Sequence, residues 1–191
     1  MDPKKVTFLL DSIRLSIRER ASVILGVLAL LWGIHVVNTL LGGRLSAYGI
    51  RPRTWEGLWG VLYAPFLHSG FGHLLANSLT FIPLAALVSL RRPMHLASVS
   101  LVVILLGGLG TWLFGRGATH VGASGVIFGY LGYLLANAWY AREPLDIAIS
   151  LGVAFTYGGM LWGVLPSAPG VSWESHLFGA LAGVFASKYF L

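Results

Sequence analysis

Residues 122–140 read GASGVIFGYLGYLLANAWY, a stretch that contains no Asp, Glu, Lys or Arg. A helix rises about 1.5 Å per residue, so about 20 apolar residues cross the hydrocarbon core of a bilayer. Backbone groups in lipid must find their hydrogen bonds within the segment, which a helix provides. The stretch therefore predicts a membrane-spanning helix over 124–140.

The composition of the whole chain indicates the same environment. Of the 191 residues, 10% are charged and 56% are hydrophobic, whereas about 25% of residues are charged in soluble domains. These figures exclude a disordered chain, collagen and a disulfide scaffold. The absence of Cys excludes thiol catalysis and cysteine-ligated zinc. We expect an integral membrane protein with one domain.

Six runs of helix length predict an all-α, polytopic bundle of six transmembrane helices. The expected spans are roughly 21–41, 73–90, 95–113, 124–140, 145–165 and 173–190. Residues 1–20 place apolar and basic positions at helical spacing, which predicts a cytoplasmic amphipathic helix on the membrane surface. A frayed tail is the alternative for that segment, and residues 21–191 are expected to form the six-helix membrane domain.

The distribution of basic residues predicts the orientation, because Lys and Arg concentrate in cytoplasmic connections. With the N-terminus in the cytoplasm, that side holds Lys4, Lys5, Arg14, Arg18, Arg20, Arg91, Arg92, Arg142 and Lys188, and the other side holds Arg44, Arg51, Arg53 and Arg116. Both termini are therefore expected in the cytoplasm, and the net charge of +6 needs no nucleic-acid partner. Nothing resembles an organellar transit peptide, so a prokaryotic cytoplasmic membrane is the expected location.

Polar side chains are few inside the predicted spans, where each carries a free-energy cost. His73 and Asn77 are four residues apart on one face of the second span, Ser124 begins the fourth and His176 begins the sixth. These three spans run in the same direction, so the four side chains share one depth near the outer surface. Singly, each is better explained by packing or a structural hydrogen bond; together they favour a catalytic site.

Glycines spaced for close helix packing connect two of these spans, because small residues four apart let helix backbones approach in lipid. They are Gly125, Gly129 and Gly132 on the fourth span and Gly179 and Gly183 on the sixth. Packing of these faces brings Ser124 beside His176, where a neutral base can take the proton of a hydroxyl nucleophile. His73, Asn77 and the free N–H groups at the start of the fourth span are candidate donors to an oxyanion.

Other chemistries fit the sequence less well. It contains no His-Glu-x-x-His motif, no phosphate-binding loop with Lys, and no Asp or Glu in the middle of a span. His68 and His120 fall in outer connections and are interpreted as capping residues. We expect neither a metal ion nor a cofactor.

Three motifs resemble those of the rhomboid intramembrane serine proteases, in the order that the family has them. They are HSGFGHLLAN (68–77), GASGVIFGYLGY (122–133) and HLFGALAG (176–183). The resemblance covers about residues 20–190. It implies a catalytic dyad without a carboxylate, which acts on transmembrane protein substrates near the membrane surface.

The resemblance also implies a role for individual residues. Ser124 is the expected nucleophile and His176 its general base, while His73, Asn77 and the Ser124 N–H form the oxyanion hole. The segment 42–72 would be a membrane-embedded first loop, and the fifth helix with loop 166–172 a mobile gate and cap. Gly122 and Phe128, which flank the nucleophile, are expected to support the site.

Three features depart from the family pattern. Phe128 stands where the family often has a Tyr stacked on the catalytic His, so the ring is kept and the hydroxyl is lost. Ser89 stands near the place of a Glu found in many members, and the Trp-Arg pair of the first loop is not evident, although Arg53 and Trp55 lie nearby. We expect these changes to affect stability more than catalysis.

Two alternatives to a peptidase are open at this point. The first is a proteolytically silent rhomboid-like protein, similar to derlins, that binds or escorts membrane proteins; such relatives usually lose the Ser or the His, and both are present here. The second is a small transporter or channel, which requires polar residues along a path across the bilayer. The clustering of the polar residues at one depth argues against the second.

Overall fold

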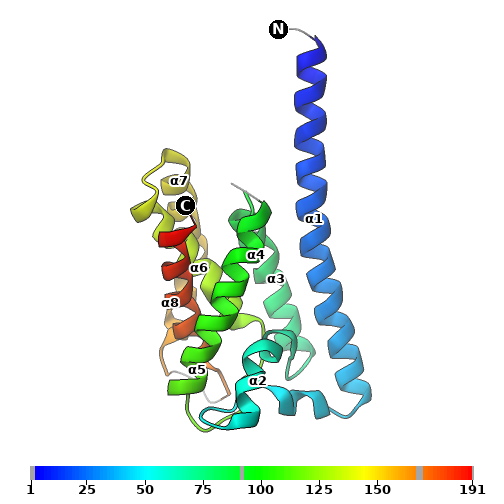
Figure 1. Ribbon diagram of the computed structural model, residues 1–191, viewed down its shortest axis with the longest axis vertical. Helices are drawn as coiled ribbons and strands as arrows, with labels where there is room; N and C mark the ends of the chain where they lie inside the picture. The colour runs from blue at the N-terminus through cyan, green and yellow to red at the C-terminus, as the bar shows by residue number, and fades with distance from the viewer. Residues whose placement is uncertain (1–2, 91–92, 167–169, 191) are drawn as a thin grey trace.

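The computed structural model describes residues 3–90, 93–166 and 170–190, which form helices joined by short connections (Figure 1). The elements are α1 (Pro3–Leu40), η1 (Arg44–Tyr48), α2 (Trp55–Tyr63), η2 (Ala64–Phe66), α3 (Phe71–Val88), α4 (Pro93–Val102), η3 (Val103–Gly107), α5 (Gly108–Phe114), α6 (Ser124–Tyr140), α7 (Pro144–Tyr157), η4 (Gly158–Val164) and α8 (Trp173–Tyr189). η3 is a π-helical segment, and the other η elements are 3-10 helices. In the described residues the sole extended pairing is an isolated bridge between Ile50 and His120. The predicted all-α fold is confirmed.

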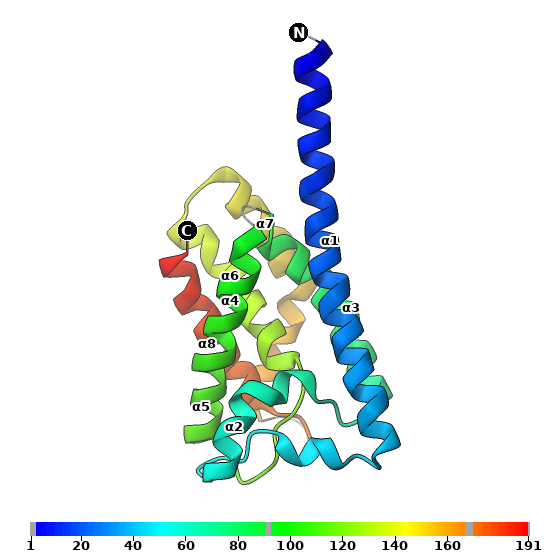
Figure 2. The ribbon, with the colours of Figure 1, turned by 45° about the vertical axis from the view of Figure 1, so that its right-hand side comes forward.

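Four helical stretches of the described chain are long and apolar enough to cross a membrane. They are Ile17–Leu40, Phe71–Val88, His95–Phe114 and Pro144–Val164. α6 and α8, with 17 residues each, lie beside these stretches in the bundle (Figures 1 and 2). The chain is an integral membrane protein, and the count of six spans stays a prediction.

The helix boundaries match the expected spans most closely at α6, and least at the N-terminus. α1 runs from Pro3 to Leu40 without a break and extends beyond the rest of the bundle (Figure 1). The residues at the expected junction, 17–21, read IRERA, and none of them is the Gly or Pro that interrupts a helix. A separate helix that ends at residue 20 is therefore not seen, and the membrane-surface position of residues 1–20 stays a prediction.

The helices that carry the candidate site all begin at the same end of the bundle. Figures 1 and 2 show the connections before α3, α6 and α8 at the end opposite the N-terminus. The first residues of these helices are Phe71, Ser124 and Trp173. The common depth expected for the polar residues thus agrees with the direction of the helices.

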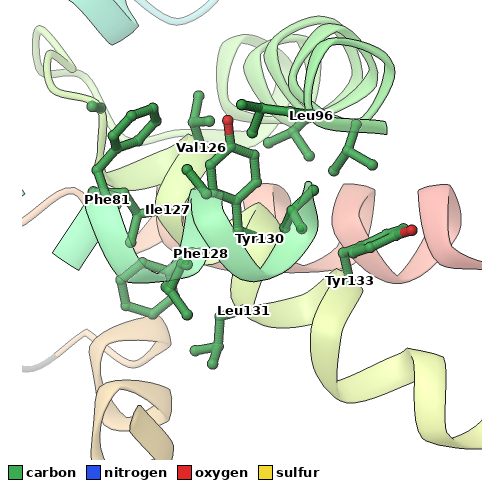
Figure 3. Close-up of a cluster of buried hydrophobic side chains, with 14 of the residues drawn as sticks. Phe81, Leu96, Val126, Ile127, Phe128, Tyr130, Leu131 and Tyr133 are labelled. Carbon is green, nitrogen blue, oxygen red and sulfur yellow. The ribbon is translucent and has the colours of Figure 1, made fainter. Parts of the chain in front are cut away.

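α6 lies at the centre of the core. Ile127, Tyr130 and Leu131 are each at most 1% exposed, and Figure 3 shows α6 side chains between Phe81 of α3 and Leu96 of α4. The Tyr130 hydroxyl lies 2.6 Å from Ser100 Oγ, so this buried polar group has a partner. Contacts on several sides fix α6, and thereby hold Ser124 at its start.

α6 and α8 approach closely through the glycines expected to pack. A Cβ atom at Gly179 would collide with the Gly125 carbonyl, and one at Gly183 with the Gly129 carbonyl. Gly132 faces the Ala180 backbone in the same way. The backbones approach this closely because no side chain separates them, as small residues allow in lipid.

Gly129 also makes a contact that the sequence did not predict. A Cβ atom at Gly129 would meet the Val103 side chain at the start of η3. Gly107, at the end of η3, lies against Gly179 of α8, where a Cβ atom would be 3.1 Å from the Gly179 Cα. The π-helical segment therefore packs against both α6 and α8.

The segment 42–72, expected as the first loop, contains η1, α2 and η2 and ends in the first residues of α3; residues 41–70 are called the arm below. Thr54 caps α2 by accepting the Gly57 N–H at 3.1 Å. Arg53 donates to the carbonyl oxygens of Gly115 at 2.8 Å and Leu113 at 3.2 Å, and Trp112 Nε1 donates to the Thr54 carbonyl at 2.8 Å. The arm is therefore fastened to the end of α5, beside the turn that leads to Ser124.

Candidate active site

Ser124 and His176, which are 52 residues apart in the sequence, meet at the starts of α6 and α8. The distance from Ser124 Oγ to His176 Nε2 is 2.9 Å. His176 Nδ1 lies 2.9 Å from the carbonyl oxygen of Gly163 in η4. Because a carbonyl only accepts, Nδ1 carries the proton of the neutral ring, and Nε2 is left to accept from the serine hydroxyl. This is the geometry of a nucleophile with its general base.

Phe128 stacks on one face of the His176 ring. Their ring centroids are 4.1 Å apart and the planes differ by 5°. Phe128 lies one turn after Ser124 on α6 and is 5% exposed, so a buried ring restrains the imidazole. The stacking proposed for this position needs the ring and not a hydroxyl, and Phe128 provides it.

The turn before Ser124 depends on Gly122. Its φ of +123° lies in the region that favours glycine. A Cβ atom there would be 2.7 Å from His73 Cε1 and 2.8 Å from His73 Nε2. The imidazole of His73 therefore packs directly on the nucleophile turn, in space that any other residue at position 122 would fill.

His73 and Asn77 project from the first turns of α3 toward the same place. His73 Nδ1 lies 3.1 Å from Ser69 Oγ. Asn77 is 7% exposed, and its Nδ2 atom is buried without a hydrogen-bond partner among the described residues. A buried amide donor without a partner carries a free-energy cost, which an acceptor placed beside Nδ2 would relieve.

A cavity of about 910 Å³ lies beside the nucleophile. It is lined by Ser124, His176, His73 and Asn77. Apolar side chains including Met160 form other parts of its wall. Its size is in the range of binding pockets that enclose a ligand. Residues 167–169 of the expected cap lie outside the described residues.

His68 is buried behind the nucleophile turn, at 1% exposure. The Ala123 N–H donates to its Nε2 at 3.4 Å, and its ring meets that of His73 edge-on at 5.2 Å. Burial, and to a smaller extent the neighbouring His73 and His35, lower the pKa of His68 to about 4. A neutral His68 therefore links the Ser124 turn to the start of α3.

His120 joins three segments. Its backbone pairs with Ile50 in the bridge, its Nε2 lies 3.2 Å from the Arg116 carbonyl, and its Nδ1 lies 2.5 Å from Ser172 Oγ. Burial lowers the pKa of His120. This histidine thus ties the arm and the 115–121 loop to the residues that precede α8.

Glu174 strengthens the same junction from inside the protein. Its Oε1 accepts the Arg116 backbone N–H at 3.1 Å and lies 3.6 Å from Arg116 Nε. The Arg116 guanidinium also donates to the Val171 carbonyl. Glu174 is 1% exposed, and a buried carboxylate needs such partners. The first turn of α8, which carries His176, is therefore fixed to the loop before Ser124.

Sequence reasoning brought together the four central residues but missed those around them. His68 and His120 were interpreted as capping residues, and the structure gives them contacts on both sides of the nucleophile turn. Glu174 was not singled out. A signal was present, because an acidic residue that begins a predicted span needs a partner, and Arg116 is the one basic residue in the 115–122 connection.

Within residues 3–90, 93–166 and 170–190, no three His, Asp or Glu side chains gather so as to hold a metal ion.

The fold and the site define a polytopic membrane protein with a serine–histidine pair at one end of its helical bundle. Comparison with known proteins agrees: the family model for the Rhomboid domain matches residues 56–191. The chain belongs to the rhomboid family, which confirms the resemblance seen in its three motifs.

Relatives come from bacteria and from plants. The chain is 43% identical to "Uncharacterized protein Rv1337" of Mycobacterium tuberculosis over 175 residues, which cover 87% of this chain and 73% of that protein. It is 31% identical to "Putative rhomboid protease YdcA" of Bacillus subtilis over 176 residues, covering 86% of this chain and 84% of that protein. It is 29% identical to "RHOMBOID-like protein 1" of Arabidopsis thaliana over 147 residues, which cover 70% of this chain and 35% of the plant protein.

Proposed function

We propose that this rhomboid is an intramembrane serine endopeptidase. The observation that carries the proposal is the 2.9 Å contact between Ser124 Oγ and His176 Nε2, with His176 Nδ1 committed to the Gly163 carbonyl. A serine hydroxyl is a weak nucleophile until a positioned base takes its proton. The family of the chain, and the name of its Bacillus relative, support the same activity.

In the first step of the proposed reaction, Ser124 Oγ attacks the carbonyl carbon of the scissile bond while His176 Nε2 takes the hydroxyl proton. The substrate oxygen then carries a negative charge. Asn77 Nδ2, the His73 imidazole and the Ser124 backbone N–H are the donors proposed to stabilise it. The Asn77 amide, buried and without a partner among the described residues, supports this role.

In the second step, the tetrahedral intermediate collapses and His176 gives its proton to the departing amine. The acyl group stays on Ser124 as an ester. Water then attacks this ester while His176 takes a proton from the water. The bond between the acyl carbon and Ser124 Oγ breaks, His176 returns the proton to Oγ, and the carboxylic acid product leaves. The cavity has room for both the peptide and the water.

Transmembrane proteins are the proposed substrates, cleaved near the outer membrane surface. The site lies at the starts of α3, α6 and α8, so it is near one end of the bundle and not at its middle. The excess of Lys and Arg on the other side supports cytoplasmic termini and an outward-facing site in a prokaryotic cytoplasmic membrane. The lipid bilayer is then the second partner of the protein.

Cleavage of a generic transmembrane substrate by the purified protein tests the proposal. Wild type is expected to cleave, and Ser124→Ala and His176→Ala are expected to be inactive. Ser98→Ala, on α4 away from the cavity, is the matched control and should keep the wild-type rate. Undiminished cleavage by Ser124→Ala would refute the proposal, and no cleavage by wild type would favour the silent, derlin-like alternative.

A further inference from the structure

The group that orients His176 comes from an unexpected part of the chain. In the Ser-His-Asp arrangement, a carboxylate accepts from Nδ1 and fixes the tautomer. Among the described residues, no carboxylate hydrogen-bonds to His176, and the Gly163 carbonyl takes that position at 2.9 Å. Gly163 belongs to η4, which continues α7 and ends the stretch Pro144–Val164.

The neighbouring side chains leave room at position 163 only for a glycine. A Cβ atom would be 2.8 Å from Phe128 Cζ and 3.4 Å from His176 Nδ1. Phe128 is buried and stacked on His176, so a displacement of its ring would disturb the stacking on the imidazole. By contrast, a Cβ atom at Gly159 in the same η4 would meet nothing within 4 Å. The requirement at position 163 is therefore one of space beside the dyad.

The carbonyl acts on both protonation states of the ring. In the neutral ring it selects the Nδ1–H tautomer, which leaves the Nε2 lone pair toward Ser124. When Nε2 has taken the serine proton, the same carbonyl accepts from a cation, and such charge-assisted bonds are stronger than neutral ones. The carbonyl thus favours the proton transfer as well as the orientation.

We propose that Gly163 is the positioning residue of the Ser124–His176 dyad, with its carbonyl in place of the missing carboxylate and its bare Cα making room for Phe128. The inference rests on the proposed function for its kinetic consequences only. The stretch Pro144–Val164 that carries Gly163 faces mostly outward, with 11% of its most apolar part buried against 39% for Phe71–Val88. The Gly163 carbonyl is thus a contact to the dyad from a helix at the outside of the bundle.

Nitrogen NMR of the ring tests the inference without any substrate. Protein labelled with ¹⁵N-histidine is compared as wild type, Gly163→Ala and Gly159→Ala, with the His176 signals assigned by their loss in His176→Ala. Wild type and Gly159→Ala should show a protonated Nδ1 and an unprotonated Nε2. Gly163→Ala should show a mixture of tautomers. An unchanged Nδ1–H tautomer in Gly163→Ala overturns the inference.

Kinetics provide a second readout. Gly163→Ala should lower kcat by about 10- to 100-fold, a part of what general acid–base catalysis contributes, with KM changed less than kcat. Gly159→Ala should stay at the wild-type rate. An equal loss of kcat in the two variants would mean that any added methyl group in η4 lowers activity, and would contradict the inference.

A double variant keeps the test decisive if Gly163→Ala alone does not fold. Phe128→Leu removes the ring edge that a methyl group at position 163 would strike. The double variant Phe128→Leu/Gly163→Ala should therefore fold where Gly163→Ala does not, with the stability of Phe128→Leu alone. A double variant that also fails to fold would contradict the clash. If Gly163→Ala shifts the tautomer while wild type cleaves nothing, the positioning role stands and the peptidase proposal falls.

Discussion

The carboxylate of Glu174 accepts the backbone N–H of Arg116 at 3.1 Å, although the two residues are 58 positions apart in the sequence. Arg116 lies in the loop that leads to Ser124, and Glu174 lies two residues before His176. The contact therefore joins the two segments that carry the proposed dyad. Because Glu174 is buried, loss of this contact should destabilise the protein more than loss of an ion pair at the surface.

Replacing Arg116 with Ala should lower the free energy of unfolding by about 1–3 kcal/mol, because it leaves a buried carboxylate with fewer partners. The half-exposed guanidinium keeps the effect below that of a fully buried pair. Thermal unfolding in detergent measures it. Glu56→Gln, in the exposed pair with Arg51, is the control and should cost less than about 1 kcal/mol. Equal effects would contradict the account of this junction.

Gly183→Ala should separate α6 from α8. The added methyl group meets the Gly129 carbonyl, and overpacking of this kind costs about 1–3 kcal/mol. Gly152→Ala on α7 is the control, since a Cβ atom there meets nothing within 4 Å; it should be neutral or slightly stabilising. Comparison of the melting temperatures checks both, and a stable Gly183→Ala variant would show that the helices do not pack as described.

His68 predicts a loss of stability in acid. Its pKa of about 4 in the folded protein lies below the ordinary value of about 6.5. Between these values the unfolded state binds more protons, so stability rises with pH and is lost as the pH falls from about 6.5 to 4. The contribution of this residue is at most about 3 kcal/mol. Melting curves over this range should be less steeply pH-dependent in His68→Gln, and an identical dependence would exclude His68 as the cause.

Reporter fusions test the orientation. A reporter inserted after Arg116 should lie outside the cytoplasm, and one at the C-terminus should lie inside, because basic residues are in excess on the C-terminal side. Alkaline phosphatase and green fluorescent protein, active on opposite sides of the membrane, measure this. Both positions on the same side would overturn the predicted topology.

Both ends of α6 could be predicted to the residue, because the residue types around them mark where the helix starts and stops. GASG begins the helix and Arg142 follows it closely, and both signals are local. The four central side chains were also predictable, since polar residues are rare in apolar spans and share one depth. Each of these inferences needs only periodicity and the direction of the helices.

The other features of the fold and the site could not be predicted, because most of them depend on contacts between segments that are distant in the sequence. α2 is only nine residues long, too short to give a clear spanning signal. His68 bonds to Ala123, 55 residues away, and Gly163 bonds to His176 from another helix. Nothing near these residues in the sequence indicates their partners. The continuity of α1 was missed because a change in composition near residue 20 suggested a boundary, although no residue there breaks a helix.

The most direct test of the central claim is the site at which a fluorophosphonate attaches. The reagent reacts with serines that a neighbouring base has activated, and mass spectrometry of peptides from the labelled protein identifies the residue. The account predicts one adduct, on Ser124, formed much more slowly in His176→Ala and at the wild-type rate in Gly159→Ala. A Ser124 that stays unmodified in the wild type, or that reacts equally fast without His176, would contradict it.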